Sequence, residues 1–89
     1  MTPEPEQSGA DEPMHPLRIW RLHQEVSQAQ LAEMSGLSQP FISLIENYLN
    51  IPLREGLERL REITGLPTDA FIRPKQFLIE NPDFLGTDP

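Results

Sequence analysis

Cysteine is absent from the 89 residues of this chain, and there are only two histidines, His15 and His23. Without cysteine, a disulfide framework, a thiolate metal site and a cysteine nucleophile are excluded. The histidines are separated by seven residues and have no evident carboxylate partners, whereas metal ligands usually occur at tighter spacings. We therefore expect no metal ion and no cofactor. No nucleophile–base pair or phosphate-binding loop is recognisable, so an enzyme is not expected either.

Long apolar runs and an excess of basic charge are also missing. No apolar run approaches the roughly 20 residues of a membrane-spanning helix. Residues 1–13 are acidic and proline-rich, unlike a secretory signal, so we expect a cytoplasmic protein with no membrane partner. The chain has 14 acidic against seven basic residues and a formal net charge of −7, which counts against a nucleic-acid-binding protein.

The acidic charge is concentrated at the two ends of the chain. Five of the 14 acids lie outside residues 14–87, namely Glu4, Glu6, Asp11, Glu12 and Asp88. Residues 14–87 have nine acidic and seven basic residues, so this part of the chain is close to neutral. It nevertheless lacks the excess of basic residues that is typical of a DNA-binding surface. Residues 1–13 lack a periodic apolar pattern, and their composition predicts a disordered tail.

From Pro16 to Phe71 the apolar residues recur at helical spacing. Nowhere do apolar and polar residues alternate with the period of two that indicates a strand. We therefore expect an all-α fold with one compact domain over residues 14–73. The expected helices run from Pro16 to about Gln24, from Gln28 to Ser35, from Gln39 to about Asn47, from Pro52 to Gly65, and over a short stretch that Thr68 caps. Residues 74–89 form a C-terminal extension, for which we expect one further turn or short helix, or a dimer contact.

Apolar spacing also predicts which side chains face inward. The expected core residues are Leu17, Trp20, Leu31, Ala32, Met34, Leu37, Ile42, Ile45, Leu57 and Leu60, and the short helix after Thr68 contains Phe71 and Ile72.

Two of the expected helices form a closely coupled pair over residues 28–46. Ser27 and Gln30 have the spacing of a capping box, and Ser38 is placed to cap the next helix. Gly36 adopts the left-handed conformation at the end of a helix without strain. The result is a rigid pair whose second helix projects outward, as a helix that reads the major groove must.

Residues 17–72, which are 56 of the 89, resemble the phage-repressor-type (Xre-like) helix-turn-helix family. The residues that carry the resemblance are Leu17, Trp20, Arg21, Val26, Ser27-Gln28, Leu31-Ala32, Gly36-Leu37-Ser38, Ile42-Ser43, Ile45-Glu46, Pro52, Leu57, Leu60 and Gly65-Leu66. The resemblance implies a compact five-helix domain that binds operator DNA, usually as a homodimer.

The family also implies roles for individual residues. Gln28 corresponds to a glutamine that touches phosphate, and Gln39 begins the recognition helix, where its amide can read adenine. Ser43 can bond a base or phosphate, and Phe41 can contact a thymine methyl group. Other positions expected at the DNA surface are Ser38, Leu44, Asn47, Tyr48 and Asn50, and Arg21 and Glu46 match a family pair that ties the first helix to the third.

Each of these roles has a simpler alternative. Gln28 is otherwise only the first residue of its helix. Gln39 and Ser43 are otherwise ordinary solvated positions, and Phe41 otherwise extends the core.

The chain departs from the family pattern around the end of the recognition helix. Leu44 stands where a basic or polar residue is usual, Tyr48 where glycine is usual, and Leu49-Asn50 where basic residues are common. Since phosphate contacts normally dominate affinity, the charge must then come from a dimer or from other bases. The other bases are Arg18, Arg54, Arg59, Arg61, Arg73 and Lys75.

Several apolar residues fall at positions where the family pattern expects exposed polar ones. They are Ile19, Leu22, Leu44 and Leu49. Such a group predicts a surface for a foreign protein partner, a homodimer contact, or cover by the apolar C-terminal residues Phe77, Leu78, Ile79 and Phe84.

Two functional hypotheses follow. The first is a sequence-specific DNA-binding transcriptional regulator, a repressor that reads the major groove of double-stranded DNA with its third helix. The alternative is a helix-turn-helix scaffold that acts mainly as a protein-binding adapter or antitoxin through exposed apolar residues.

Overall fold

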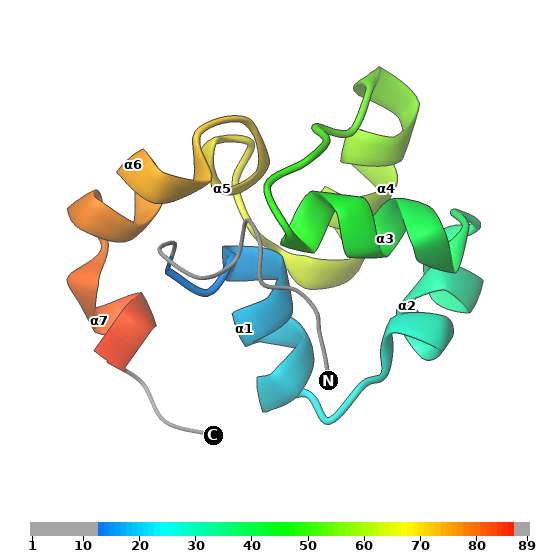
Figure 1. Ribbon diagram of the computed structural model, residues 1–89, viewed down its shortest axis with the longest axis horizontal. Coiled ribbons are helices and arrows are strands. Elements are labelled where there is room, and N and C mark those ends of the chain that lie inside the picture. The colour runs from blue at the N-terminus through cyan, green and yellow to red at the C-terminus, as the bar shows by residue number, and fades with distance from the viewer. Residues whose placement is uncertain (1–12, 87–89) are drawn as a thin grey trace, which may run out of the picture.

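The computed structural model describes residues 13–86, and within this range the chain forms seven helices and no strand. The helices are α1 (Pro16–His23), α2 (Gln28–Ser35), α3 (Gln39–Glu46), α4 (Arg54–Thr64), α5 (Asp69–Ile72), α6 (Pro74–Glu80) and α7 (Pro82–Gly86). Figure 1 shows α1 in the middle of the molecule, with α2, α3 and α4 towards one side and α5, α6 and α7 towards the other. The all-α prediction is confirmed. Two helices, rather than one turn or short helix, follow the five expected ones.

Side-chain caps fix where α2 and α3 begin. The Ser27 hydroxyl accepts a hydrogen bond from the amide of Gln30 at 3.0 Å, and the Gln30 side chain accepts one from the amide of Ser27 at 2.8 Å. The Ser38 hydroxyl accepts from the amide of Phe41 at 3.2 Å. These bonds satisfy amides that have no partner within the helix, so the predicted starts of both helices are confirmed.

The start of α4 and the cap of α5 were predicted wrongly. Pro52 is buried ahead of α4, which begins at Arg54 with Leu53 as its N-cap. The first hydrogen bond of α4 joins the amide of Leu57 to the carbonyl of Leu53 at 2.7 Å. Thr68 occupies the N-cap position of α5, but it has helical backbone angles and its side chain makes no capping bond.

The turn between α2 and α3 depends on Gly36, which has a φ of +76° and ends α2 as predicted. Gly65 ends α4 with the same φ of +76°. The two glycines differ in their surroundings. A Cβ on Gly36 would lie 2.7 Å from Nη1 of Arg59, whereas one on Gly65 would meet nothing within 4 Å.

This difference gives a matched pair of substitutions. Gly65→Ala should lower the free energy of unfolding by about 1–2 kcal/mol, which is the cost of a left-handed conformation for an L-residue. Gly36→Ala should cost about 0.5–1 kcal/mol more, because Arg59 must move and give up its 3.3 Å bond to the carbonyl of Ser35. Urea denaturation of both variants measures the difference. Equal losses would show that the contact with Arg59 does not constrain the turn.

The core is formed by one or two apolar residues from each of the first five helices. Leu17, Leu31, Ile42, Ile45 and Leu60 are fully buried, as predicted, and Phe71 of α5 is almost fully buried beside them. Trp20, Leu37 and Leu57 are half-buried against this core.

One of the predicted core residues, Met34, is instead exposed. In α2 the inward position belongs to Ser35, which donates to the carbonyl of Ala32 and accepts from the amide of Leu37, both at 3.3 Å. These two bonds satisfy the buried hydroxyl, so a polar residue can occupy the position that the apolar spacing assigned to Met34.

The C-terminal helices complete the same core. Phe77 and Leu78 of α6 are buried in it, and the ring of Phe84 contacts that of Phe77 edge to face with centroids 5.4 Å apart. Phe84 and Ile19 line one small depression, and Ile19 is buried. For Ile19, the expected cover by the C-terminal residues of the same chain is therefore confirmed.

The other apolar residues at positions where the family pattern expects polar ones are not covered. Leu22, Leu44 and Leu49 are exposed, and so is Ile79 on α6.

None of the helices in residues 13–86 is long and apolar enough to cross a membrane. In the same residues, no three histidine or acidic side chains come together where they could hold a metal ion.

Candidate nucleic-acid interface

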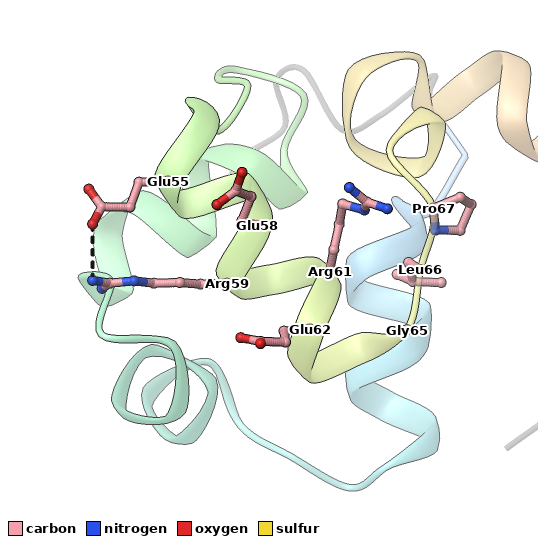
Figure 2. Close-up of a pocket in the computed structure, with 8 residues that line it drawn as sticks. All are labelled: Glu55, Glu58, Arg59, Arg61, Glu62, Gly65, Leu66 and Pro67. Carbon is pink, nitrogen blue, oxygen red and sulfur yellow. Dashed lines mark hydrogen bonds and ion pairs between the residues drawn. The ribbon is translucent and has the colours of Figure 1, made fainter.

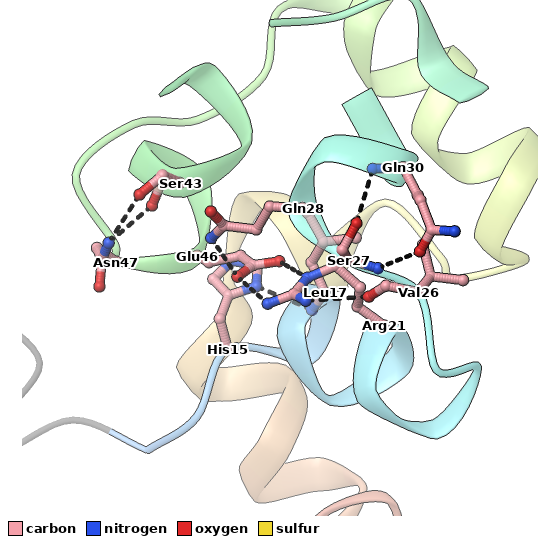
Figure 3. A network of polar contacts seen from close by, with 10 residues as sticks. All are labelled: His15, Leu17, Arg21, Val26, Ser27, Gln28, Gln30, Ser43, Glu46 and Asn47. Atoms are coloured by element: carbon pink, nitrogen blue, oxygen red, sulfur yellow. Dashed lines mark hydrogen bonds and ion pairs between the residues drawn. The ribbon is translucent and has the colours of Figure 1, made fainter. Parts of the chain in front are cut away.

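A buried polar network joins α1, α2 and α3 behind the outward face of α3 (Figure 3). Nε of Arg21 donates to Oε2 of Glu46 at 2.8 Å, and Nη2 of Arg21 donates to Oε1 of Glu46 at 3.0 Å. Nη1 of Arg21 donates to the carbonyl of Val26 at 3.0 Å. Arg21 and Glu46 are only 8% and 6% exposed, so this bidentate pair is shielded from water. It fixes the angle between α1 and α3.

Gln28 is the third member of the network. Its Nε2 donates to Oε1 of Glu46 at 3.1 Å, and its side chain is half-buried. In this arrangement the amide serves the packing of α2 against α3. The contact of Gln28 with phosphate stays a prediction.

The outward face of α3 consists of residues spaced three and four apart. Gln39, Pro40 and Leu44 are exposed, and Ser43 and Asn47 are half-buried. Ser38, the N-cap, is exposed at the start of this face. Because residues four apart lie one above the other on a helix, Pro40 and Leu44 share a line, and so do Gln39, Ser43 and Asn47.

Three of the predicted DNA-contacting residues hold partners within the chain. Nδ2 of Asn47 donates to the carbonyl of Ser43 at 2.9 Å and to its hydroxyl at 3.3 Å, which closes the end of α3. The carbonyl of the Asn50 side chain accepts from the amide of Ile51 at 2.8 Å.

Phe41 is half-buried and packs against the core. One of its ring carbons lies 3.9 Å from where a Cβ of Gly56 would be, so the ring faces α4. This geometry supports the packing role for Phe41 more than contact with a base.

Tyr48 explains why the family pattern has glycine at this point of the loop. Its φ is +64°, a conformation that non-glycine residues adopt only at a cost. Its hydroxyl donates to the carbonyl of Pro13 at 2.9 Å, and its ring centroid is 5.1 Å from that of His15. Nζ of Lys75 lies 5.1 Å from the same ring centroid. Tyr48 therefore links the loop to the N-terminal segment and to α6.

The structural role of His15 was missed in the sequence. Its Nδ1 accepts a hydrogen bond from the amide of Leu17 at 3.0 Å, so it is the N-cap of α1. The side chain is 2% exposed, and burial lowers the pKa of His15 from 6.5 to about 4. Proline at the first helical position marks the preceding residue as the cap, which was the available signal.

Acidic residues lie beside Arg59, Arg61 and Arg73. A depression on α4 and the turn after it is lined by Glu55, Glu58, Arg59, Arg61 and Glu62 together with Gly65, Leu66 and Pro67 (Figure 2). Nη2 of Arg59 is 3.4 Å from Glu55, and Nη2 of Arg73 is 3.4 Å from Asp69. Three carboxylates against two guanidinium groups make this side of the molecule a poor surface for a polyanion.

Comparison with known proteins bears on the same segment. Residues 17–71, more than half of the chain, match a family model described as helix-turn-helix. No curated protein and no solved structure matches the chain.

Proposed function

Because the chain belongs to this helix-turn-helix family, a family of DNA-binding regulators, we propose that it is a sequence-specific transcriptional repressor. In this proposal α3 enters the major groove of double-stranded DNA. The observation that carries it is the division of α3 into two faces. Ile42, Ile45 and Glu46 hold the inner face against the rest of the domain. On the outer face, Gln39, Pro40 and Leu44 are exposed. A rigidly held helix with an accessible face satisfies the geometric requirement for reading bases.

A homodimer fits this proposal. Residues 13–86 contain seven bases and nine acids, so one copy has little charge to offer the phosphates. Two copies would place two α3 helices on half-sites about one helical turn apart and would double a weak interaction. Sedimentation of the full chain with and without its DNA site measures the stoichiometry.

A second function is favoured by one specific observation. Four exposed apolar side chains follow one another along the end of α3 and the loop after it, namely Leu44, Leu49, Ile51 and Leu53. We name these four residues the apolar strip. Larger exposed apolar patches mark protein-binding surfaces, so these four exposed residues within a short stretch of sequence support a protein-binding adapter or antitoxin.

Selection of DNA fragments by the purified full chain, followed by salt titration of the best site, separates the two functions. The regulator predicts one shared motif and an affinity that falls steeply with salt. The adapter predicts no enriched motif even at low salt. Because the net charge of −7 weakens nonspecific binding to DNA, enrichment of a motif would indicate sequence-specific recognition.

Gln39 should be the strongest single determinant of sequence preference. Its exposed amide offers a donor and an acceptor, the pattern that adenine presents in the major groove. Gln39→Ala should weaken binding to the best site by about 1–3 kcal/mol and relax discrimination at one base pair. Binding to the best site and to its single-base variants measures both effects.

Two other glutamines provide the comparison. Gln76→Ala on α6 removes an exposed amide whose 2.9 Å bond goes to Glu80, and it should leave binding unchanged. Gln28→Ala should weaken all sequences about equally, because phosphate contacts position the protein without reading sequence. If Gln39→Ala keeps both affinity and discrimination, α3 is not the reading helix.

A further inference from the structure

The outward face of α3 carries no charged side chain. Over Gln39–Glu46 the only ionisable residue is Glu46, and it is buried and bonded to Arg21 and Gln28. The absence of Arg and Lys from α3 and the burial of Glu46 together remove three of the usual ways to read a base. Arginine and lysine recognise guanine through its N7 and O6 atoms, and a carboxylate recognises the amino group of cytosine. None of these groups is available on this face, so α3 lacks the side chains that best select G·C pairs.

The centre of the same face is apolar. Pro40 and Leu44 are exposed, lie four residues apart, and stand on the side of α3 opposite the buried Ile42 and Ile45. Gln39 and Ser43 flank them along the neighbouring line of the helix. The face therefore presents an apolar ridge beside an amide.

A base edge in the major groove has only one apolar group, the 5-methyl group of thymine. An apolar ridge gains nothing from the polar edges of guanine and cytosine, whose hydrogen-bonding groups it would leave unpaired. Building on the proposed function, we propose that α3 selects A·T base pairs, with Leu44 and Pro40 packed on thymine methyl groups and Gln39 bonded to adenine. The ligand is thus double-stranded DNA whose half-sites contain A·T pairs where α3 lies.

Deoxyuridine provides a test that changes only the methyl group. The full chain first selects its best site from a random library, and each thymine of that site is then replaced in turn by deoxyuridine. At the one or two thymines under Leu44 and Pro40, we expect Kd to rise about three- to fivefold, which is the effect of losing one buried apolar carbon. Thymines elsewhere in the site should show no change.

A second arm assigns the effect to Leu44. In Leu44→Ala the loss caused by deoxyuridine should disappear at one position, because the partner of the methyl group is gone. Ile79→Ala is the matched control, since Ile79 is an exposed apolar residue on α6 outside the proposed interface. It should keep the full deoxyuridine effect. Circular dichroism of both variants checks that the helices are intact.

The outcomes separate this proposal from the function on which it rests. A motif of G·C pairs under α3, or indifference to deoxyuridine at every thymine, would overturn the A·T proposal while leaving the DNA-binding function in place. A deoxyuridine effect that survives in Leu44→Ala would overturn the role of Leu44. Failure to enrich any motif would overturn both proposals and favour a protein partner on the apolar strip.

Discussion

Replacing Glu46 by alanine is expected to lower the free energy of unfolding by about 3–5 kcal/mol, because it leaves a buried arginine without its counter-charge. Arg21 would lose both hydrogen bonds to the carboxylate, at 2.8 and 3.0 Å, and would keep only the bond to the carbonyl of Val26. Gln28 would lose its acceptor as well. A domain of this size has only about 5–15 kcal/mol of stability in total, so the variant should be close to unfolding at room temperature.

Glu55→Ala is the matched control for this substitution. Glu55 also pairs with an arginine, Arg59, but at 3.4 Å and with its side chain 82% exposed. Exposed pairs of this kind contribute about 0.3–0.5 kcal/mol. Urea denaturation of the two variants compares a shielded pair with a solvated one. Similar losses in the two variants would mean that the pair of Arg21 and Glu46 does not hold α1 against α3.

Acid is expected to destabilise the fold through His15, and this is the second large effect. Burial holds the pKa of His15 at about 4, compared with 6.5 for an ordinary histidine. Between these two values the unfolded chain binds a proton that the folded chain excludes. Stability should therefore fall as the pH decreases from about 6.5 to about 4, and this one group should account for about 3 kcal/mol of the loss.

The structural reason is the cap of α1. Nδ1 of His15 accepts from the amide of Leu17, and a protonated imidazole has no acceptor left for that bond. His15→Asn keeps a side-chain acceptor at the N-cap and removes the titration. The free energy of unfolding, measured in urea at several pH values from 7 to 4, should depend less steeply on pH in His15→Asn than in the original chain. Parallel curves would show that His15 does not drive the acid sensitivity.

The elements that were predicted well from sequence depend on contacts between near neighbours. Ser27 caps with a partner three residues away, Ser38 does the same, and Gly36 needs only its own backbone. Such signals can be identified in a short stretch of sequence. They gave both bounds of α2 correctly, and those of α3 to within one residue.

The errors arise where the outcome depends on distant parts of the chain. The spacing of apolar residues placed Met34 inward, but the surrounding helices leave that position to Ser35, whose hydroxyl is satisfied locally. Phe77, Leu78 and Ile79 are consecutive and apolar, so their spacing could not show that the first two are buried and the third is exposed.

The interface shows the same limit. The sequence placed Gln28 at the start of its helix, but the bond to Glu46, 18 residues away, is a product of the folded state. Tyr48 could be recognised as a departure from a glycine position, yet nothing nearby in the sequence predicts its bond to Pro13, 35 residues earlier. Long-range pairs like these decide which polar side chains point towards a ligand and which are already engaged.

The two-faced construction of α3 also bears on how this protein can change over evolutionary time. The residues that secure the helix, Ile42, Ile45 and Glu46, are all directed inward, whereas Gln39 and Leu44 are exposed and contribute little to the core. Exposed substitutions of this kind usually alter stability by less than about 0.5 kcal/mol. Mutations on the outer face can therefore accumulate without unfolding the domain, so a gene duplicate could acquire a different binding preference in single steps while remaining folded throughout.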